Sequence, residues 1–186
     1  MDLFQQYNQG LPYADFLARH ANDMQKERWR KTFEQVQLSP AQCNLLGSFR
    51  RRMPVLCLAG AWCGDCISQC PIFERFAHAN FVIEARYLDR DEHSDVQKEL
   101  QINAGNRVPV LVFFSEDGKE VARYGERTLS KYRNLMHEQG GALCPTGITV
   151  PGDSLLADVT QDWLDEFERV QWILCLSPRL RQLHQD

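Results

Sequence analysis

The sequence predicts an α/β protein with a mixed central sheet flanked by helices, and with further helical segments at both ends. Three observations support this class. Strand-like and helix-like segments alternate between residues 39 and 140, a continuous apolar run "VLCLAGA" occupies 55–61, and the chain ends are amphipathic. Alternating strands and helices followed by a hairpin are typical of a sheet with helices on both faces.

Composition limits the classes of partner. The chain has 186 residues, of which 44% are hydrophobic and 25% are charged, as in an ordinary globular protein of one domain with additions. Its net charge of -4 argues against a nucleic-acid partner, which normally requires a basic face. The longest apolar stretch, "VLCLAGAWC", is too short to cross a bilayer, so no membrane partner is expected.

The first segment, residues 1–38, reads as a helical N-terminal extension. "YADFLARH" and "KERWRKTFEQVQL" place apolar groups, including Trp29, at spacings of three and four residues. Ser39 and Pro40 then supply an N-cap and a first helical residue for the next helix. The arginines at 50–52 are expected to lie at a solvated helix end.

The central segment, residues 39–140, is the predicted domain, with element order α-β-α-β-α-β-β-α. Its first strand is apolar throughout, as expected for a strand buried on both faces. The remaining elements are a helix at 63–79, a strand at 81–88, a helix capped by Ser94, a strand at 108–114 paired in a hairpin with 119–125, and a helix from 129.

The last segment, residues 141–186, is predicted to be a linker followed by a helical extension that packs on the core. A helix over about 154–176 carries an apolar stripe. The stripe could instead join two copies of the chain as a homodimer. Its members are Leu156, Val159, Trp163, Phe167, Val170 and Leu174.

The stretch "AGAWCGDCISQCP" at 59–71 is the candidate site. Cys63 lies where an apolar strand ends and a helix begins, and the free N–H groups of a helix N-terminus stabilise a thiolate. Cys63 is therefore the predicted nucleophile, with Trp62 shielding one side. Two intervening residues bring Cys66 within disulfide reach, so Cys66 is the predicted resolving thiol.

Four features together resemble the thioredoxin family: "WCGDC" at 62–66, Pro71, "VPVLVFF" at 108–114, and a hairpin ending at Gly125. The resemblance covers about residues 39–140 and is greatest to bacterial members with W-C-G-D-C and extra helices. It implies a thioredoxin fold and a thiol–disulfide oxidoreductase that binds no cofactor. Protein disulfides would be its substrates, and a reductase or a small thiol would supply electrons.

The resemblance also implies a substrate-binding edge. The peptide bond between Val108 and Pro109 would be cis and would face the two cysteines. A cis bond there would leave backbone groups free to hold an extended substrate segment. Trp62, Val108 and Pro109 are thus the predicted substrate-binding residues.

Several residues depart from the family pattern. Asp65 replaces the usual proline, and a carboxylate beside two thiols should raise their pKa unless a cation offsets it. Arg107 could offset Asp65 or contact a partner's carboxylate, and a solvated arginine is equally compatible. The family's buried aspartate falls at Cys57 and its lysine near Tyr87, so neither supplies the usual charge.

Cys70 lies one helical turn after Cys66, and three interpretations stay open. It can be a small buried residue, or an alternative resolving thiol that pairs with Cys66 or protects Cys63. It can also join Cys63 and Cys66 in a metal or iron–sulfur site, which would need a fourth ligand. No second C-x-x-C is present, and no metal is expected.

The prediction is therefore a thiol–disulfide oxidoreductase acting through Cys63 and Cys66. No secretory signal is visible, so the cytoplasm is the expected compartment, where thiols stay reduced. Two alternatives remain: a binding module of the same fold with little turnover, and a metal-binding protein that uses Cys63, Cys66 and Cys70.

Overall fold

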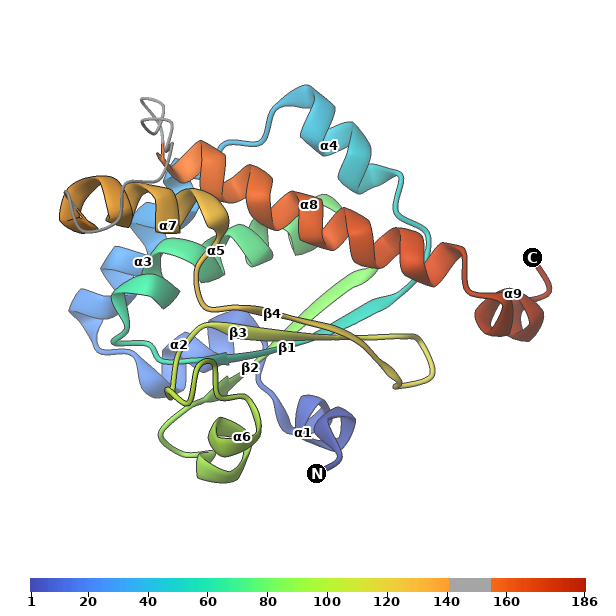
Figure 1. Cartoon of the computed structure of the whole chain (residues 1–186), viewed down its shortest axis with the longest axis horizontal. Helices are drawn as coiled ribbons and strands as arrows, with labels where there is room; N and C mark the ends of the chain where they lie inside the picture. Colours follow the sequence, from blue (N-terminus) through green and yellow to red (C-terminus); the bar gives the residue numbers. More distant parts are fainter. Residues whose placement is uncertain (141–154) are drawn as a thin grey trace.

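The computed structural model describes residues 1–140 and 155–186, which build one four-stranded sheet covered by helices (Figure 1). The strands are β1 (Met53–Ala59), β2 (Ile83–Asp89), β3 (Val110–Phe114) and β4 (Glu120–Gly125). Their order across the sheet is β2-β1-β3-β4. β1 runs parallel to β2 and antiparallel to β3, and β3 and β4 form an antiparallel hairpin. The predicted α/β class with a mixed sheet is confirmed.

Helices cover both faces of this sheet. In Figure 1, α3, α4, α5, α7 and α8 lie on one side, and α1 and α6 lie on the other. No described helix is long and apolar enough to cross a membrane. The helices are α1 (Leu3–Gln9), α2 (Tyr13–His20), α3 (Asp23–Gln35), α4 (Pro40–Gly47), α5 (Gly64–Ala79), α6 (Ser94–Glu99), α7 (Leu129–Leu135) with a π-helical turn η1 (Met136–Gly140), α8 (Leu155–Cys175) and α9 (Pro178–His184).

Helix α8 is part of the core. The apolar stripe of α8 faces inward: Val159, Trp163, Phe167, Val170 and Leu174 are all buried. The Phe167 ring lies at the centre of an aromatic cluster, 5.2 Å from Phe76 of α5 and 5.0 Å from Phe113 of β3. Because one helix side chain touches both α5 and the sheet, α8 and α5 cover the sheet as one layer.

The N-terminal helices reach the candidate site. Trp29 of α3 is fully buried, and its indole N–H donates to the Ala61 carbonyl at 2.9 Å. Ala61 lies two residues before Cys63, in the turn between β1 and α5. A buried hydrogen bond of this kind holds the backbone of that turn in place. Residues 1–38 therefore help to position the cysteine motif.

Two local predictions were wrong. Ser94 is the first residue of α6, and His93 occupies the capping position. Arg51 is not solvated: it is only 6% exposed and forms ion pairs with Glu116 and with Asp186. The reason is that α4 already ends at Gly47, so Arg51 leads into β1 under the C-terminal residues. The predicted linker, residues 141–154, lies outside the described residues.

Candidate active site

Cys63 and Cys66 lie at the start of α5, directly after the central strand. Cys63 is the N-cap residue of α5 and is partly buried, and its thiol donates to the Val108 carbonyl at 3.7 Å. The Val108–Pro109 peptide bond is cis. Cys66 is fully buried, and its sulfur accepts the Gly60 N–H at 3.4 Å. The outer thiol is thus the one that a partner can reach.

The two thiols share a hydrogen bond, and their ionisation is linked. The pKa of the Cys63 thiol is raised, chiefly by this hydrogen bond and then by burial. Burial raises the pKa of the Cys66 thiol, but hydrogen bonds from Cys63, Cys70 and the Gly60 amide lower it to about 5. The pair therefore loses its first proton well below the ordinary thiol pKa and its second well above it. These directions favour the thiolate on Cys66 in the resting pair, so Cys63 becomes the nucleophile by passing its proton to Cys66.

Trp62 flanks the exposed thiol and is held by the turn after β2. Its side chain is 45% exposed, and its indole N–H donates to Asp91 at 3.1 Å. The Arg90 guanidinium lies over the ring at 4.5 Å and pairs with Asp91. The turn after β2 thus orients Trp62 through Arg90 and Asp91. In this turn the Asp89 carboxylate accepts the backbone N–H of Asp91, which makes an Asx-type turn. An aspartate at the end of a strand is the sequence pattern that favours such a turn.

The charge of Asp65 is offset, but not by Arg107. The Arg127 guanidinium lies 2.7 Å from the Asp65 carboxylate, and the Lys131 ammonium lies 3.7 Å from it. Arg107 instead pairs with Glu126 at 3.2 Å and stays 45% exposed. The reason is topological. Arg127 and Lys131 lie in the segment after β4, and this segment passes over the start of α5. Arg107 lies beside Glu126, the first residue after β4. Of the alternatives left open for Arg107, the offset of Asp65 is therefore the one that the structure does not show, because Arg127 supplies it.

Two further cysteines lie beneath the pair. Cys57, at the position of the family's aspartate, is fully buried, with its sulfur 3.9 Å from that of Cys70. Tyr87 is also fully buried, and its hydroxyl donates to the Cys70 carbonyl at 3.4 Å. Within residues 1–140 and 155–186, no group of three histidine, cysteine or acidic side chains has a geometry that could hold a metal ion.

A family model described as Thioredoxin matches residues 10–137. The chain belongs to the thioredoxin family. Thioredoxin-2 of Saccharomyces cerevisiae is 33% identical over 72 residues, which are 39% of this chain and 65% of that protein. This chain therefore spans about two thirds of its curated relative's length. Membership of this family indicates thiol–disulfide redox chemistry.

Two solved structures share the fold at low sequence identity. One is a protein of unknown function from Pseudomonas aeruginosa, with a TM-score of 0.68 and 15% identity over 88% of this chain and 93% of that one. The other is an HIV epitope-scaffold, with a TM-score of 0.67 and 16% identity over 91% of this chain and 97% of that one. Both matches cover more of the chain than the central segment, residues 39–140, so the shared fold extends into the flanking segments.

A buried hydrogen-bond chain links this thioredoxin-family site to α8, beyond the segment that the family model matches. The indole N–H of Trp163 donates to the Gln69 side chain at 2.9 Å. The Gln69 amide in turn donates to the carbonyls of Glu126 and Asp65, at 2.9 and 3.2 Å. Gln69 and Glu126 were not predicted, because neither a polar residue on a helix nor one in the turn after a strand gives a sign in sequence that its partners are buried.

Replacing Arg127 by Gln is expected to raise the pH of half-maximal thiol alkylation by up to about one unit. The Asp65 carboxylate would lose its nearest cation, and its negative charge acts to raise the pKa of Cys66. A higher pKa moves the rise of the alkylation rate to higher pH, so the rate falls at acidic pH, near the midpoint, and changes little at neutral pH. Iodoacetamide rates measured against pH check this. Arg123→Gln, which removes a cation paired with Glu99, is the control and should leave the midpoint unchanged.

The double variant Asp65→Asn with Arg127→Gln tests the cause of that shift. Removing the carboxylate together with its cation should return the midpoint to the wild-type value. A single Arg127 variant with the wild-type profile would contradict the electrostatic role of this ion pair.

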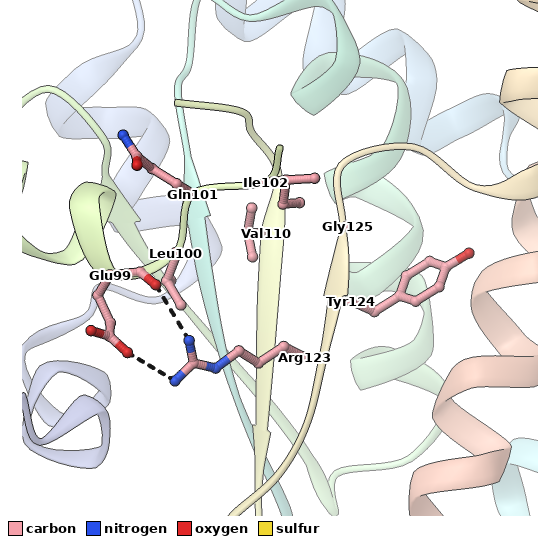
Figure 2. A pocket seen from close by; sticks show the side chains of 8 residues that line it. All are labelled: Glu99, Leu100, Gln101, Ile102, Val110, Arg123, Tyr124 and Gly125. Atoms are coloured by element: carbon pink, nitrogen blue, oxygen red, sulfur yellow. Dashed lines mark hydrogen bonds and ion pairs between the residues drawn. The ribbon is translucent and has the colours of Figure 1, made fainter. Parts of the chain in front are cut away.

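A pocket of about 290 Å³ opens beside the cis-proline, on β3 and β4 (Figure 2). Figure 2 shows the Arg123 side chain reaching Glu99, with Tyr124 pointing to the opposite side of β4. Val110 and Gly125 form the end of the pocket nearest Pro109. A Cβ at Gly125 would lie 2.5 Å from the Pro109 carbonyl oxygen, so this close approach requires glycine. The lining contains no cysteine, so the thiol chemistry lies outside this pocket.

Proposed function

We propose that this chain is a thiol–disulfide oxidoreductase that acts on protein disulfides through Cys63 and Cys66. The observation that carries the proposal is the arrangement of the two sulfurs. Cys63 is partly exposed at the N-terminus of α5, and Cys66 is buried behind it and hydrogen-bonded to the Gly60 amide. A reachable nucleophile with an adjacent second thiol is what reversible disulfide exchange requires.

The reaction proceeds in two exchanges. The Cys63 thiolate attacks one sulfur of the substrate disulfide, forming a mixed disulfide and releasing the other substrate sulfur as a thiolate, which takes up a proton. The Cys66 thiolate then attacks the Cys63 sulfur and displaces the remaining substrate thiolate. The substrate has gained two electrons and two protons, and Cys63 and Cys66 are joined. A reductase or a small thiol returns two electrons to the pair in a reducing compartment such as the cytoplasm.

Substrate recognition uses the edge beside Cys63. An extended substrate segment would lie along the backbone at Val108 and Pro109, with the exposed Trp62 ring flanking it. The orientation of Trp62 by Asp91 and Arg90 fixes one wall of this edge. Gly64 leaves the approach open, because a Cβ there would meet nothing within 4 Å. A binding edge built largely from backbone suits many protein substrates of different sequence.

Reduction of insulin disulfides tests the proposal. The wild-type protein with dithiothreitol as electron donor should accelerate insulin precipitation, and Cys63→Ser should reduce the rate to that of dithiothreitol alone. Cys43→Ser removes an exposed thiol that lies outside the cysteine motif, in helix α4. It is the matched control, and wild-type activity is expected. Equal rates for wild type and Cys63→Ser would contradict the proposal and favour a binding module of the same fold.

A further inference from the structure

Four cysteine sulfurs form a continuous series that runs from the surface into the core. Cys63 caps helix α5, and Cys66 and Cys70 follow it on the first turns of that helix. The ionisation of Cys66 depends on both of these neighbours. The Cys70 sulfur lies 3.9 Å from that of Cys57 on the central strand. Cys57, Cys66 and Cys70 are all fully buried, so Cys63 is the only member of the series that contacts solvent.

We propose that Cys57 and Cys70 form a second, buried dithiol that accepts the disulfide from Cys63 and Cys66 by internal exchange. The inference rests on the proposed function, which supplies the first disulfide. Because Cys57 and Cys70 have no exposed surface, a protein substrate or an enzyme-sized oxidant cannot reach them. Oxidation can enter only through Cys66, which lies one helical turn from Cys70 on α5.

The transfer takes two balanced steps. The Cys70 sulfur attacks Cys66 of the oxidised pair: the Cys66–Cys70 bond forms, the Cys63–Cys66 bond breaks, and Cys63 leaves as a thiolate that takes up the proton from Cys70. The Cys57 sulfur then attacks Cys70: the Cys57–Cys70 bond forms, and Cys66 leaves and takes up the proton from Cys57. No electrons enter or leave the chain, and Cys63 and Cys66 end as thiols.

The first step requires the first turns of α5 to distort, because Cβ atoms one helical turn apart lie about 5–6 Å from each other and a disulfide needs about 3.5–4.5 Å. Cys66 and Cys70 are separated by one helical turn and lie on the same face of α5. Cys57 and Cys70 face each other from β1 and α5, and their sulfurs must approach from 3.9 Å to the length of a disulfide bond, about 2.05 Å. Burial raises the pKa of both thiols, so each proton must move with its sulfur exchange. The inner transfer should therefore be slower than the first oxidation.

The consequence is a larger electron capacity. A fully reduced chain would reduce one substrate disulfide through Cys63 and Cys66, pass that disulfide inward, and then reduce a second one. Each chain would thus deliver four electrons rather than two before it requires a donor.

Counting free thiols on a single peptide tests this inference. The wild-type protein is reduced, freed of reductant and mixed with excess oxidised glutathione, and samples are quenched at intervals with N-ethylmaleimide in neutral guanidinium chloride, which unfolds the chain and exposes every free thiol. Trypsin cleaves after Arg52 and Arg75, which releases a peptide, 53–75, that contains Cys57, Cys63, Cys66 and Cys70 and no other cysteine. Four adducts mark the reduced peptide, two mark one disulfide, and none marks two disulfides. Glutathione attached to a thiol is distinguished by its mass.

The expected course is four adducts, then two, then none. Chymotryptic cleavage after Trp62 separates Cys57 from the other three cysteines, so a Cys57–Cys70 bond should keep the two fragments joined. A peptide that stays at two adducts would overturn the inference and leave the proposed function standing. A peptide that keeps all four would contradict the proposed function itself.

Two variants test the route of entry. Cys57→Ala should stop at one disulfide, with a single adduct left on its three remaining cysteines. Cys63→Ser should keep Cys57 and Cys70 reduced, because the oxidant no longer reaches Cys66. A Cys57–Cys70 bond formed in Cys63→Ser would overturn the proposed route. Cys43→Ser lies outside the peptide and should follow the wild-type course.

Discussion

Replacing Cys66 by Ser is expected to trap substrates on Cys63 as mixed disulfides and to lower turnover by more than about 100-fold. Cys66 adjoins Cys63, so it resolves the mixed disulfide as an intramolecular nucleophile. Such groups act at effective concentrations that free thiols at millimolar levels cannot match. Serine keeps a donor and an acceptor beside the Gly60 amide but cannot form the disulfide bond.

Non-reducing electrophoresis with a disulfide-containing substrate measures the trapped species, and insulin reduction measures turnover. The double variant Cys63→Ser with Cys66→Ser should form no adduct, which shows that Cys63 holds the trapped substrate. Wild-type turnover in Cys66→Ser, with no adduct, would show that another group resolves the intermediate.

Replacing Phe167 by Ala is expected to lower the free energy of unfolding by about 3–5 kcal/mol. Its ring is fully buried and packs on three others, at 6.0 Å from Phe73, 5.2 Å from Phe76 and 5.0 Å from Phe113. Alanine removes this apolar surface from the core and leaves a cavity that helix α8 and the sheet cannot fully close. The loss is large because one side chain joins two layers of the molecule.

Urea unfolding followed by tryptophan fluorescence measures this loss. Ile173→Ala lies on the same helix with its side chain 41% exposed, and it should change stability by no more than about 0.5 kcal/mol. Comparable small losses in both variants would show that α8 adds little to the core.

The central fold was predictable because its strands and helices carry strong local patterns. β1 is apolar in every position, and the stripe of α8 repeats at spacings of three and four over several turns. Element ends were less predictable. Serine is a residue type that often caps helices, but the chain already adopts helical geometry at Ser94. Which of two neighbouring residues becomes the first helical one depends on the path of the chain in the folded structure.

The candidate site was predictable only where it is local in sequence. Cys63 and Cys66 are separated by two residues at a strand-to-helix junction, so one short motif contains both. The ion pair between Asp65 and Arg127 joins residues 62 positions apart, and it forms because the chain after β4 returns to the start of α5. No sequence period encodes such a contact. Trp29 is a similar case: its helical spacing marks it as apolar, but nothing indicates that its N–H reaches Ala61.

The short segment between α1 and α2 closes one border of the sheet. Leu11 exchanges two backbone hydrogen bonds with Tyr87, at 2.9 and 2.8 Å, and so lies beside the outermost strand β2. Gly10 permits this, because a Cβ there would come within 2.9 Å of the Arg86 Cβ. An uncovered strand border is a template for pairing with other chains and for aggregation. The N-terminal residues thus protect the protein against self-association through β2. Deleting the chain through Leu11 would expose this strand and lower solubility, while the cysteine pair at the start of α5 would keep its surroundings.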